Sequence, residues 1–151
     1  MSASVTLERG RRAVGVRSVA LSDDVFADHF PGNPILPGIY VIEGLAQTAG
    51  ILLWETTDRR RVAVMTTVDR ARFSSFARPG DLVQLAVEVE ALEERAAVVR
   101  GEATVGDRRI STARLTFSLQ DPERLIPPPY QPFWQHMMSV WCRQDEANGN
   151  A

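Results

Sequence analysis

The chain has 151 residues, of which 44% are apolar, and a net charge of −2 at neutral pH. A chain of this length fits one domain with a sizeable core, and its weak acidity gives no strong attraction to nucleic acid or to an anionic membrane. The single cysteine, Cys142, excludes an internal disulfide and a cysteine-rich metal site. The N-terminus lacks the apolar core of a signal peptide and no apolar run is long enough to span a bilayer, so we expect a cytoplasmic protein.

The first predicted elements are two short strands. Residues 4–8 (SVTLE) alternate weakly, residues 13–21 (AVGVRSVAL) alternate again, and Gly10 lies in the turn between them, which predicts a hairpin. Residues 22–38 are dense in Asp, Pro and Gly. Regular structure does not persist through such a composition, so this segment is predicted to be a loop.

A long helix is expected to begin just after Pro37-Gly38 and to run to about Trp54. Apolar residues recur there at helical spacing, namely Ile39, Ile42, Ala46, Ala49 and Leu53. The other faces are apolar as well, which is typical of a helix that is buried all round. The charged segment TTDRRR (56–61) then ends the helix in solvent, and we interpret Arg59, Arg60 and Arg61 as solvated charges.

Four further strands are predicted by period-two or β-branched patterns, at residues 62–73, 81–92, 95–105 and 109–119. Turns separate them at RPGD (78–81), LEER (92–95) and VGDRR (105–109). A hairpin, one buried helix and four consecutive strands indicate an α+β domain. An antiparallel sheet wrapped around one long central helix satisfies both patterns, and we place this domain at residues 1–120.

Residues 121–151 form a C-terminal extension rich in Pro and Trp. Its proline-rich part is not compatible with a central strand or a helix interior. Residues 133–143 are predicted to form a short helix with Trp134, Met137, Met138 and Trp141 on one side, and the last eight residues are predicted to be disordered. The helix either covers apolar surface of the domain or docks a partner enzyme; we favour the first and expect no catalytic role for His136.

The segment HFPGNPILPGIYVIE (29–43) carries the chemistry. His29 lies in the loop one residue before Phe30-Pro31, and an imidazole titrates at about 6.5, so it can accept a proton at cellular pH; the alternative is a structural histidine. Glu43 lies on an apolar stripe of the helix. A carboxylate there is paired, hydrogen-bonded or protonated, and it acts either as a general acid or as a structural group. Gln47, one turn later, is placed to hydrogen-bond Glu43.

The helix start supplies a third element. Gly38 stands where free N–H groups and the positive end of the helix dipole collect, so it is either a turn residue or an oxyanion site. Pro37 and its neighbouring prolines stiffen the segment. A base, an amide pocket and an acid are what β-elimination beside a thioester carbonyl needs. His29 meets Glu43 either within one subunit or across two.

The motifs HFPGNPILPG and IEGLAQTAG, with fourteen residues from His29 to Glu43, resemble the 3-hydroxyacyl-acyl carrier protein dehydratases (FabZ-like), which have the hot-dog fold; VDRARFSSFARPGD (68–81) agrees with them in length. The resemblance implies a homodimer or a trimer of dimers in which His29 of one subunit faces Glu43 of the other beside an acyl tunnel. It also implies that Gly38 binds the thioester oxygen and that the substrate arrives on the phosphopantetheine of an acyl carrier protein, with no metal or redox cofactor.

The chain departs from this family pattern at several places. It begins almost at the first strand, Asp28 stands where glycine is common, and Ser74 and Ser75 stand where basic residues are usual. Together with the tail, these differences indicate a specialised relative, such as a polyketide-pathway enzyme. Arg72 and Arg78 are candidate contacts for acidic or phosphate groups of the carrier protein.

Two other functions fit the same residues. The first is a hot-dog thioesterase or an enoyl hydratase; the spacing from Asp24 to His29 fits a hydratase motif, but the Asn-Pro of that motif is missing. The second is a non-catalytic accessory subunit of a mixed dimer, which the presence of both His29 and Glu43 disfavours.

Overall fold

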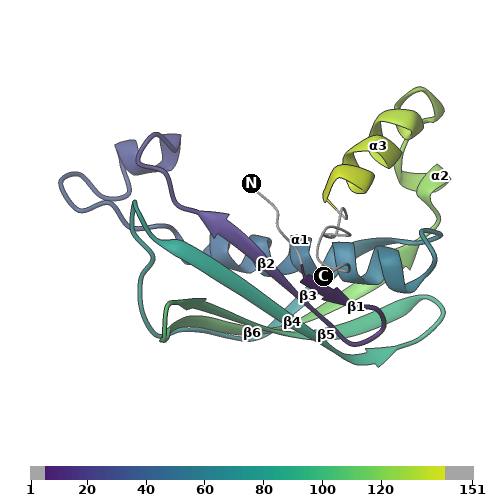
Figure 1. The fold of residues 1–151 in the computed structure, drawn as a ribbon, viewed down its shortest axis with the longest axis horizontal. Coiled ribbons are helices and arrows are strands. Elements are labelled where there is room, and N and C mark those ends of the chain that lie inside the picture. The colour runs from purple at the N-terminus through teal and green to yellow at the C-terminus, as the bar shows by residue number, and fades with distance from the viewer. Residues whose placement is uncertain (1–5, 142–151) are drawn as a thin grey trace, which may run out of the picture.

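The computed structural model describes residues 6–141 as one curved antiparallel sheet with a long helix lying on one of its faces (Figure 1). The sheet order is β1-β2-β4-β5-β6-β3. The strands are β1 (Thr6–Glu8), β2 (Arg12–Ser18), β3 (Val62–Phe73), β4 (Leu82–Leu92), β5 (Ala96–Val105) and β6 (Arg108–Gln120). The long helix is α1 (Gly38–Thr56), which confirms the predicted α+β architecture.

The sheet follows the predicted alternation. In β4, Val83, Leu85 and Val87 point to the core and are buried, while the residues between them are more exposed. β3 begins and ends at the predicted residues, and the other three long strands do so within one residue. The pairing of β3 with β6 is interrupted by register shifts between Met65 and Thr67 and between Asp69 and Arg72, which bends this edge strand around the helix.

Small residues let α1 approach the sheet closely. A Cβ added at Gly15 of β2 would lie 2.5 Å from Oγ1 of Thr48 on α1, and one added at Gly101 of β5 would lie 3.0 Å from Leu45. Thr48 is fully buried, and its hydroxyl donates to the Gly44 carbonyl at 2.9 Å. The hydroxyl is therefore satisfied inside the helix and does not disturb the apolar contact.

The expectation that α1 is buried on all sides is wrong for the protomer. Ile39, which the spacing placed on the core face, is 65% exposed, and Glu43 is exposed as well. Gln47 and Gly50 continue the same stripe, at intermediate burial. A single sheet covers only one side of a helix, so the apolar residues on the opposite side need another covering layer.

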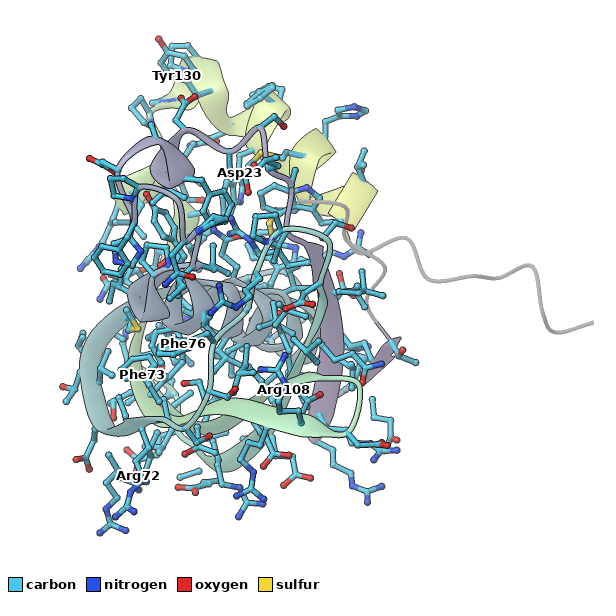
Figure 2. All side chains as sticks on the ribbon, turned by 90° about the vertical axis from the view of Figure 1, so that its left-hand side faces the viewer. Asp23, Arg72, Phe73, Phe76, Arg108 and Tyr130 are labelled. Atoms are coloured by element: carbon cyan, nitrogen blue, oxygen red, sulfur yellow. The ribbon has the colours of Figure 1, made fainter. Side chains whose placement is uncertain are left out.

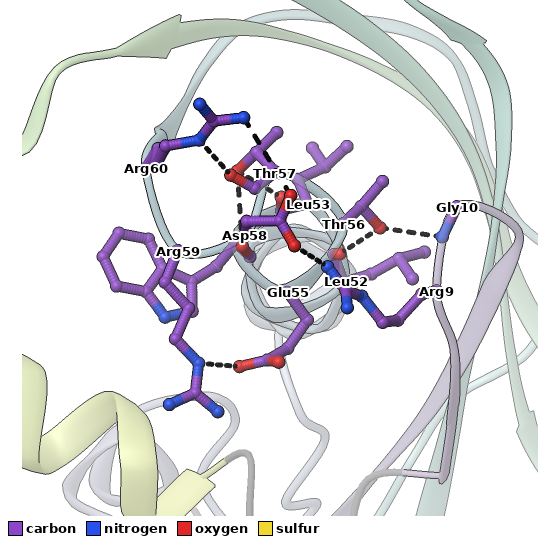
Figure 3. Close-up of polar contacts among 11 residues, drawn as sticks. Arg9, Gly10, Leu52, Leu53, Glu55, Thr56, Thr57, Asp58, Arg59 and Arg60 are labelled. Atoms are coloured by element: carbon purple, nitrogen blue, oxygen red, sulfur yellow. Dashed lines mark hydrogen bonds and ion pairs between the residues drawn. The ribbon is translucent and has the colours of Figure 1, made fainter.

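The C-terminal end of α1 is fastened by side chains (Figure 3). The Thr56 hydroxyl donates to the Leu52 carbonyl at 2.6 Å and accepts from the Gly10 amide at 2.8 Å. Asp58 lies in the left-handed backbone region, with φ of 53°, and forms an ion pair with Arg9. The hydrogen bond from Arg9 holds the pKa of the Asp58 carboxyl below its ordinary value. The loop after the helix is thus tied to the β1–β2 turn.

Arg59, Arg60 and Arg61 all make ion pairs here or nearby. Arg59 pairs with Glu55 at 2.9 Å and lies in the close-up, whereas Arg61 pairs with Asp121. Arg59 and Arg60 are exposed, as predicted for solvated charges. Arg61 is only 19% exposed and differs from that prediction, because it joins the start of β3 to the start of the tail.

The predicted loop contains one short 3-10 helix, η1 (Asp24–Ala27), and the tail contains α2 (Pro122–Leu125), η2 (Pro128–Tyr130) and α3 (Gln131–Trp141). The short tail helix is therefore confirmed, two residues earlier than predicted, with Pro132 in its first turn, where proline is tolerated. Cys142 and the predicted disordered end lie outside the described residues. Within residues 6–141, no helix is both long and apolar enough to cross a membrane.

Candidate active site

His29 lies in the loop before α1, partly buried, with its ring orientation fixed. Its Nδ1 is 2.8 Å from the Ile35 carbonyl oxygen, and its ring stacks on Phe30 at 4.0 Å between centroids. Because a carbonyl oxygen only accepts hydrogen bonds, Nδ1 carries the hydrogen in this contact. The other nitrogen, Nε2, therefore holds the lone pair of the neutral ring, which is the arrangement of a base.

The loop around His29 is held by backbone and arginine contacts. The Ile35 amide donates to the His29 carbonyl at 3.0 Å, so the loop closes on itself. Arg78 donates from Nη1 to Asn33 Oδ1 at 2.6 Å. Arg78 was predicted as a carrier-protein contact, but in this structure its guanidinium bonds the base-bearing loop. Its first role here is thus to position that loop.

Gly38 begins α1, directly after Pro37 in extended conformation. Its N–H has no carbonyl partner four residues earlier within the helix, as for any first helical residue. A Cβ at this position would lie 2.5 Å from Cε1 of Phe73 at the end of β3. Any side chain at position 38 would thus collide with the Phe73 ring unless that ring moved. The free N–H of Gly38 lies beside the same ring.

Glu43 and Gln47 form the polar part of the exposed α1 stripe. Gln47 Nε2 donates to Glu43 Oε1 at 3.0 Å, as the one-turn spacing predicted. This contact uses one carboxyl oxygen and leaves Oε2 for another partner, since no other hydrogen bond to Glu43 exists within residues 6–141. The burial that the apolar pattern implied for Glu43 is not observed, because this side of α1 faces solvent in the protomer.

A cavity of about 280 Å³ begins at Glu43 and Gln47 and runs between α1 and β3. Its walls are mostly apolar and include Ala46, Gly50, Met65 and Phe117. Three residues of the tail helix, Trp134, Met138 and Trp141, line it as well. The carboxyl that sequence reasoning assigned to catalysis thus stands at an apolar space large enough for a small ligand.

The structure joins the predicted site residues in two groups. Glu43 and Gln47 share the cavity, whereas His29, Pro37 and Gly38 belong to the loop and helix start and do not line it. No hydrogen bond or ion pair connects His29 with Glu43 within residues 6–141. The two groups stay separate in one protomer.

Arg72 lies on the outer part of β3 and is exposed, and its side chain makes no ion pair or hydrogen bond inside the described part of the chain. Figure 2 shows its side chain extending into solvent at the same end of the molecule as Phe73 and Phe76. Both phenylalanines are more than half exposed, at 55% and 57%. Between them, the Ser74 hydroxyl donates to the Arg109 backbone carbonyl at 3.1 Å, and the Ser75 hydroxyl accepts from Arg108 Nη1 at 2.6 Å.

Phe73 is a site residue that the sequence pattern did not indicate. It read as the last apolar position of a strand, and its contact with Gly38 is between segments 35 residues apart in the chain. Likewise, periodicity placed Trp134, Met138 and Trp141 on one side of a helix, but it did not show that this side would line the Glu43 cavity. Within residues 6–141 no cluster of His, Cys, Asp and Glu is arranged to hold a metal ion.

Comparison with known proteins identifies the family. Residues 3–114 match the FabA-like domain. The chain is also 35% identical over 118 residues to the 3-hydroxyacyl-[acyl-carrier-protein] dehydratase FabZ of Thermoanaerobacter sp. strain X514, which covers 78% of this chain and 83% of that relative. The chain belongs to the FabZ-like dehydratase family. The residues that carried the resemblance, from His29 to Glu43, lie inside the matched region.

Solved structures agree on the fold of this FabZ-like chain. The dehydratase heterocomplex ApeI:P from Xenorhabdus doucetiae matches with a TM-score of 0.65 at 19% identity, covering 80% of this chain and 83% of that one. A hot-dog-like protein from Thermanaerovibrio acidaminovorans also gives 0.65, at 18% identity, covering 86% and 93%. The predicted hot-dog fold is confirmed. Thioesterases share this fold, so the fold alone does not select the reaction.

Proposed function

We propose that this chain removes water from a 3-hydroxyacyl thioester on an acyl carrier protein and forms the trans-2-enoyl thioester. Family membership supports the reaction, because relatives 35% identical over 118 residues are dehydratases of such substrates. The observation that carries the proposal is the His29 Nδ1 contact with the Ile35 carbonyl, at 2.8 Å. It leaves Nε2 as the proton acceptor, which is the first requirement of the elimination.

The elimination balances on two side chains. His29 Nε2 removes the proton from C2, the C2–H electrons form the C2=C3 double bond, and the C3–O bond breaks. Protonated Glu43 gives its proton to the departing hydroxyl, which leaves as water. The Gly38 N–H donates to the thioester oxygen while that oxygen carries enolate charge. The proton gained by His29 then returns to Glu43 through solvent, and the site is ready for another turnover.

The site is complete in a dimer. Because His29 and Glu43 belong to separate groups in the protomer, we infer that the loop of one subunit meets the α1 stripe of the other. β3 is an edge strand, and its Val64 and Val68 are 38% and 41% exposed. Edge-to-edge pairing through β3 would cover them. A homodimer is the simplest assembly, with a trimer of dimers or a mixed dimer as larger or unequal versions.

The proposed partner is an acyl carrier protein that delivers the substrate on its phosphopantetheine arm. Arg72, free of acidic partners within residues 6–141, is the candidate contact for the carboxylates or phosphate of that protein. The chemistry uses only acid–base groups, so we propose no metal or redox cofactor. We further propose that the enzyme works in the cytoplasm, in fatty acid or polyketide-type synthesis, with the tail marking a specialised member.

The test is mass spectrometry of carrier-bound 3-hydroxyacyl groups, with loss of one water as the readout. His29→Gln and Glu43→Gln should each lower kcat at least about 100-fold, the usual contribution of a positioned acid or base. His136→Gln and Glu55→Gln are matched controls, since they change the same residue types elsewhere and should keep the wild-type rate. Circular dichroism checks that each variant folds.

Four results would speak against the proposal. A His29→Gln enzyme at the wild-type rate would remove the base assignment. A Glu43→Gln enzyme at that rate would leave a single-base mechanism, with Glu43 only orienting groups. Release of free thiol from the substrate, without water loss, would identify a thioesterase, and complete inactivity of the wild type would favour an accessory subunit.

A further inference from the structure

The cavity has an open end and a closed end. Glu43 at the open end is exposed, whereas Ile51 and Trp54, further along α1, are 2% and 5% exposed. Glu43 and Trp54 are eleven residues apart, which is roughly 16 Å along a helix at 1.5 Å per residue. A chain attached to a group reacting at Glu43 would therefore extend along α1 toward Trp54.

The closed end is formed by α3. The rings of Trp54 and Trp134 meet edge to face, with centroids 6.1 Å apart and an interplanar angle of 86°. Met138 is 4% exposed and belongs to the core cluster, and Trp141 packs against that cluster. Figure 1 shows α3 above the C-terminal half of α1, on the side away from the sheet. These side chains close the space beyond Gly50.

The segment that leads to α3 is anchored at Asp121, ten residues before the helix begins. Asp121, which precedes α2, forms an ion pair with Arg61 at the beginning of β3 and lies 3.4 Å from Arg95. Arg61 is 19% exposed, so this pair is partly shielded from solvent. Residues 121–141 are thus held at one end by the ion pairs of Asp121 and at the other by the aromatic and methionine contacts of α3. These contacts hold α3 in a defined position against α1.

The wall lies outside the part of the chain that defines the family. The FabA-like match covers residues 3–114, whereas α3 covers Gln131–Trp141. The open end of the cavity, at Glu43, therefore lies within the family match, whereas the α3 residues at its closed end lie outside that match. Ligand pockets generally measure about 300–1,000 Å³, and this one, at about 280 Å³, is small.

We propose that α3 is the distal wall of the acyl-binding cavity and that Met138 and Trp141 set the longest acyl chain the enzyme accepts. This inference rests on the proposed function, because it takes the cavity at Glu43 as the acyl site. The occupant of the closed end is the end of the acyl chain, since indole rings and methionine side chains make up most of that end; the buried Trp134 Nε1–H is a polar atom there that has no hydrogen-bond partner within residues 6–141. In this proposal, α3 limits the length of the acyl chain that the cavity can hold.

The direct test uses variants that open the closed end. Trp141→Ala and Met138→Ala should extend the range of accepted 3-hydroxyacyl chains, raising kcat/KM about tenfold or more for chains just beyond the wild-type limit, the size of effect expected when pocket space changes by a methylene or more. Short chains should stay within about twofold, because His29 and Glu43 are untouched. Phe133→Ala and Val140→Ala are matched controls on the exposed side of α3.

A complementary variant keeps the test sharp if opening the wall harms folding. A Cβ added at Gly50 meets no atom within 4 Å, and Gly50 lines the cavity. The Cβ of Gly50→Leu therefore has room, the rest of its side chain would take up space in the cavity, and leucine favours helix more than glycine does. Gly50→Leu should therefore lower kcat/KM at least about tenfold for the longest substrate that the wild type accepts, so that the longest accepted chain becomes shorter.

A second readout separates this inference from the proposed function. Saturated acyl-pantetheine thioesters cannot lose water, so their stabilisation of the protein in thermal melts reports binding alone. The chain length at which this stabilisation falls should increase in Trp141→Ala and not in Phe133→Ala. Identical length profiles in folded Trp141→Ala and wild type would overturn the inference even if water loss occurs. Shifted binding profiles without any water loss would instead overturn only the proposed reaction.

Discussion

At the scale of single residues, Gly38 shows how two constraints meet at one position. Sequence analysis left two explanations for this glycine, a turn residue or a site where a substrate oxygen approaches its N–H. The structure adds the ring of Phe73, which would lie 2.5 Å from an added Cβ. Phe73 is 55% exposed, so it has room to turn away. The steric and the chemical reasons for glycine are therefore separable by mutation.

Gly38→Ala should lower both stability and kcat/KM, because the methyl group displaces Phe73 and also stands over the helix N–H. Adding Phe73→Ala should restore the melting temperature relative to that of Phe73→Ala alone, since the clash is gone. Activity should stay at least about tenfold down, about 1.4 kcal/mol of transition-state binding. Thermal melts and water-loss kinetics on the four proteins measure this. Full recovery of activity would mean that Gly38 matters only for packing.

At the scale of elements, the strands were predictable because alternation is a local property. β3 was placed at its observed bounds from sequence alone, since β-branched residues, which favour strands, are frequent from Val62 to Val68. The end of α1 was predictable from TTDRRR for the same reason. The exposed stripe of Ile39 and Glu43 was not, because periodicity shows that a face is apolar but not which neighbour covers it.

The candidate-site residues are predictions from the sequence, and the sequence did not predict their geometry. His29, Gly38 and Glu43 were assigned from residue type and the proline-rich setting, and Gln47 from helical spacing. The Arg78 contact with Asn33 joins residues 45 apart and leaves no local pattern. The position of α3 has the same origin, since which apolar surface a helix covers depends on the three-dimensional path of the chain.

The end of α1 offers a test of how charge supports an element. Arg9 holds the pKa of Asp58 below its ordinary value of 3.8, so the charged form is favoured by folding. A depressed pKa in the folded state contributes stability above the unfolded value, and this contribution is lost as pH falls through the folded pKa. Asp58→Asn keeps a residue that tolerates the left-handed backbone at φ 53° and removes only the charge.

Asp58→Asn should therefore lower the melting temperature slightly near neutral pH, and the difference from wild type should vanish well below pH 3.8, where both side chains are neutral. The pair is exposed, so the effect is small and weakens with salt. Melting curves over a pH series measure it. A difference that persists unchanged in acid would show that the side chain matters through its shape and not its charge.

At the scale of the whole molecule, the open edge at β3 connects assembly with catalysis. Val64 and Val68 are partly exposed on this edge, and the proposed dimer covers them. Because His29 and Glu43 would come from different subunits, loss of the dimer should also remove activity. The mass of the assembly and the rate of water loss should then both depend on the same β3 interface.

Val68→Lys should convert the dimer to a monomer, because a charged lysine on an edge strand opposes pairing with a second edge. Light scattering coupled to gel filtration gives the mass, and water-loss kinetics should fall in step with the dimer fraction. Leu92→Lys is the matched control, since Leu92 is 41% exposed like Val68 but lies at the far end of β4. An active Val68→Lys monomer would place His29 and Glu43 within one chain.

The two edges of the sheet are unequal, and this limits how far copies of the chain can join. β3 offers twelve residues for pairing, whereas β1 at the opposite edge has three within the described residues 6–141. Once two long edges have met about a twofold axis, each outer border within the described residues consists of β1 and of residues 15–18 of β2, which are shorter than β3 and a poorer template for a further chain. We therefore expect the sheet to extend across the proposed dimer and no further, so that copies of the chain do not assemble into a fibre.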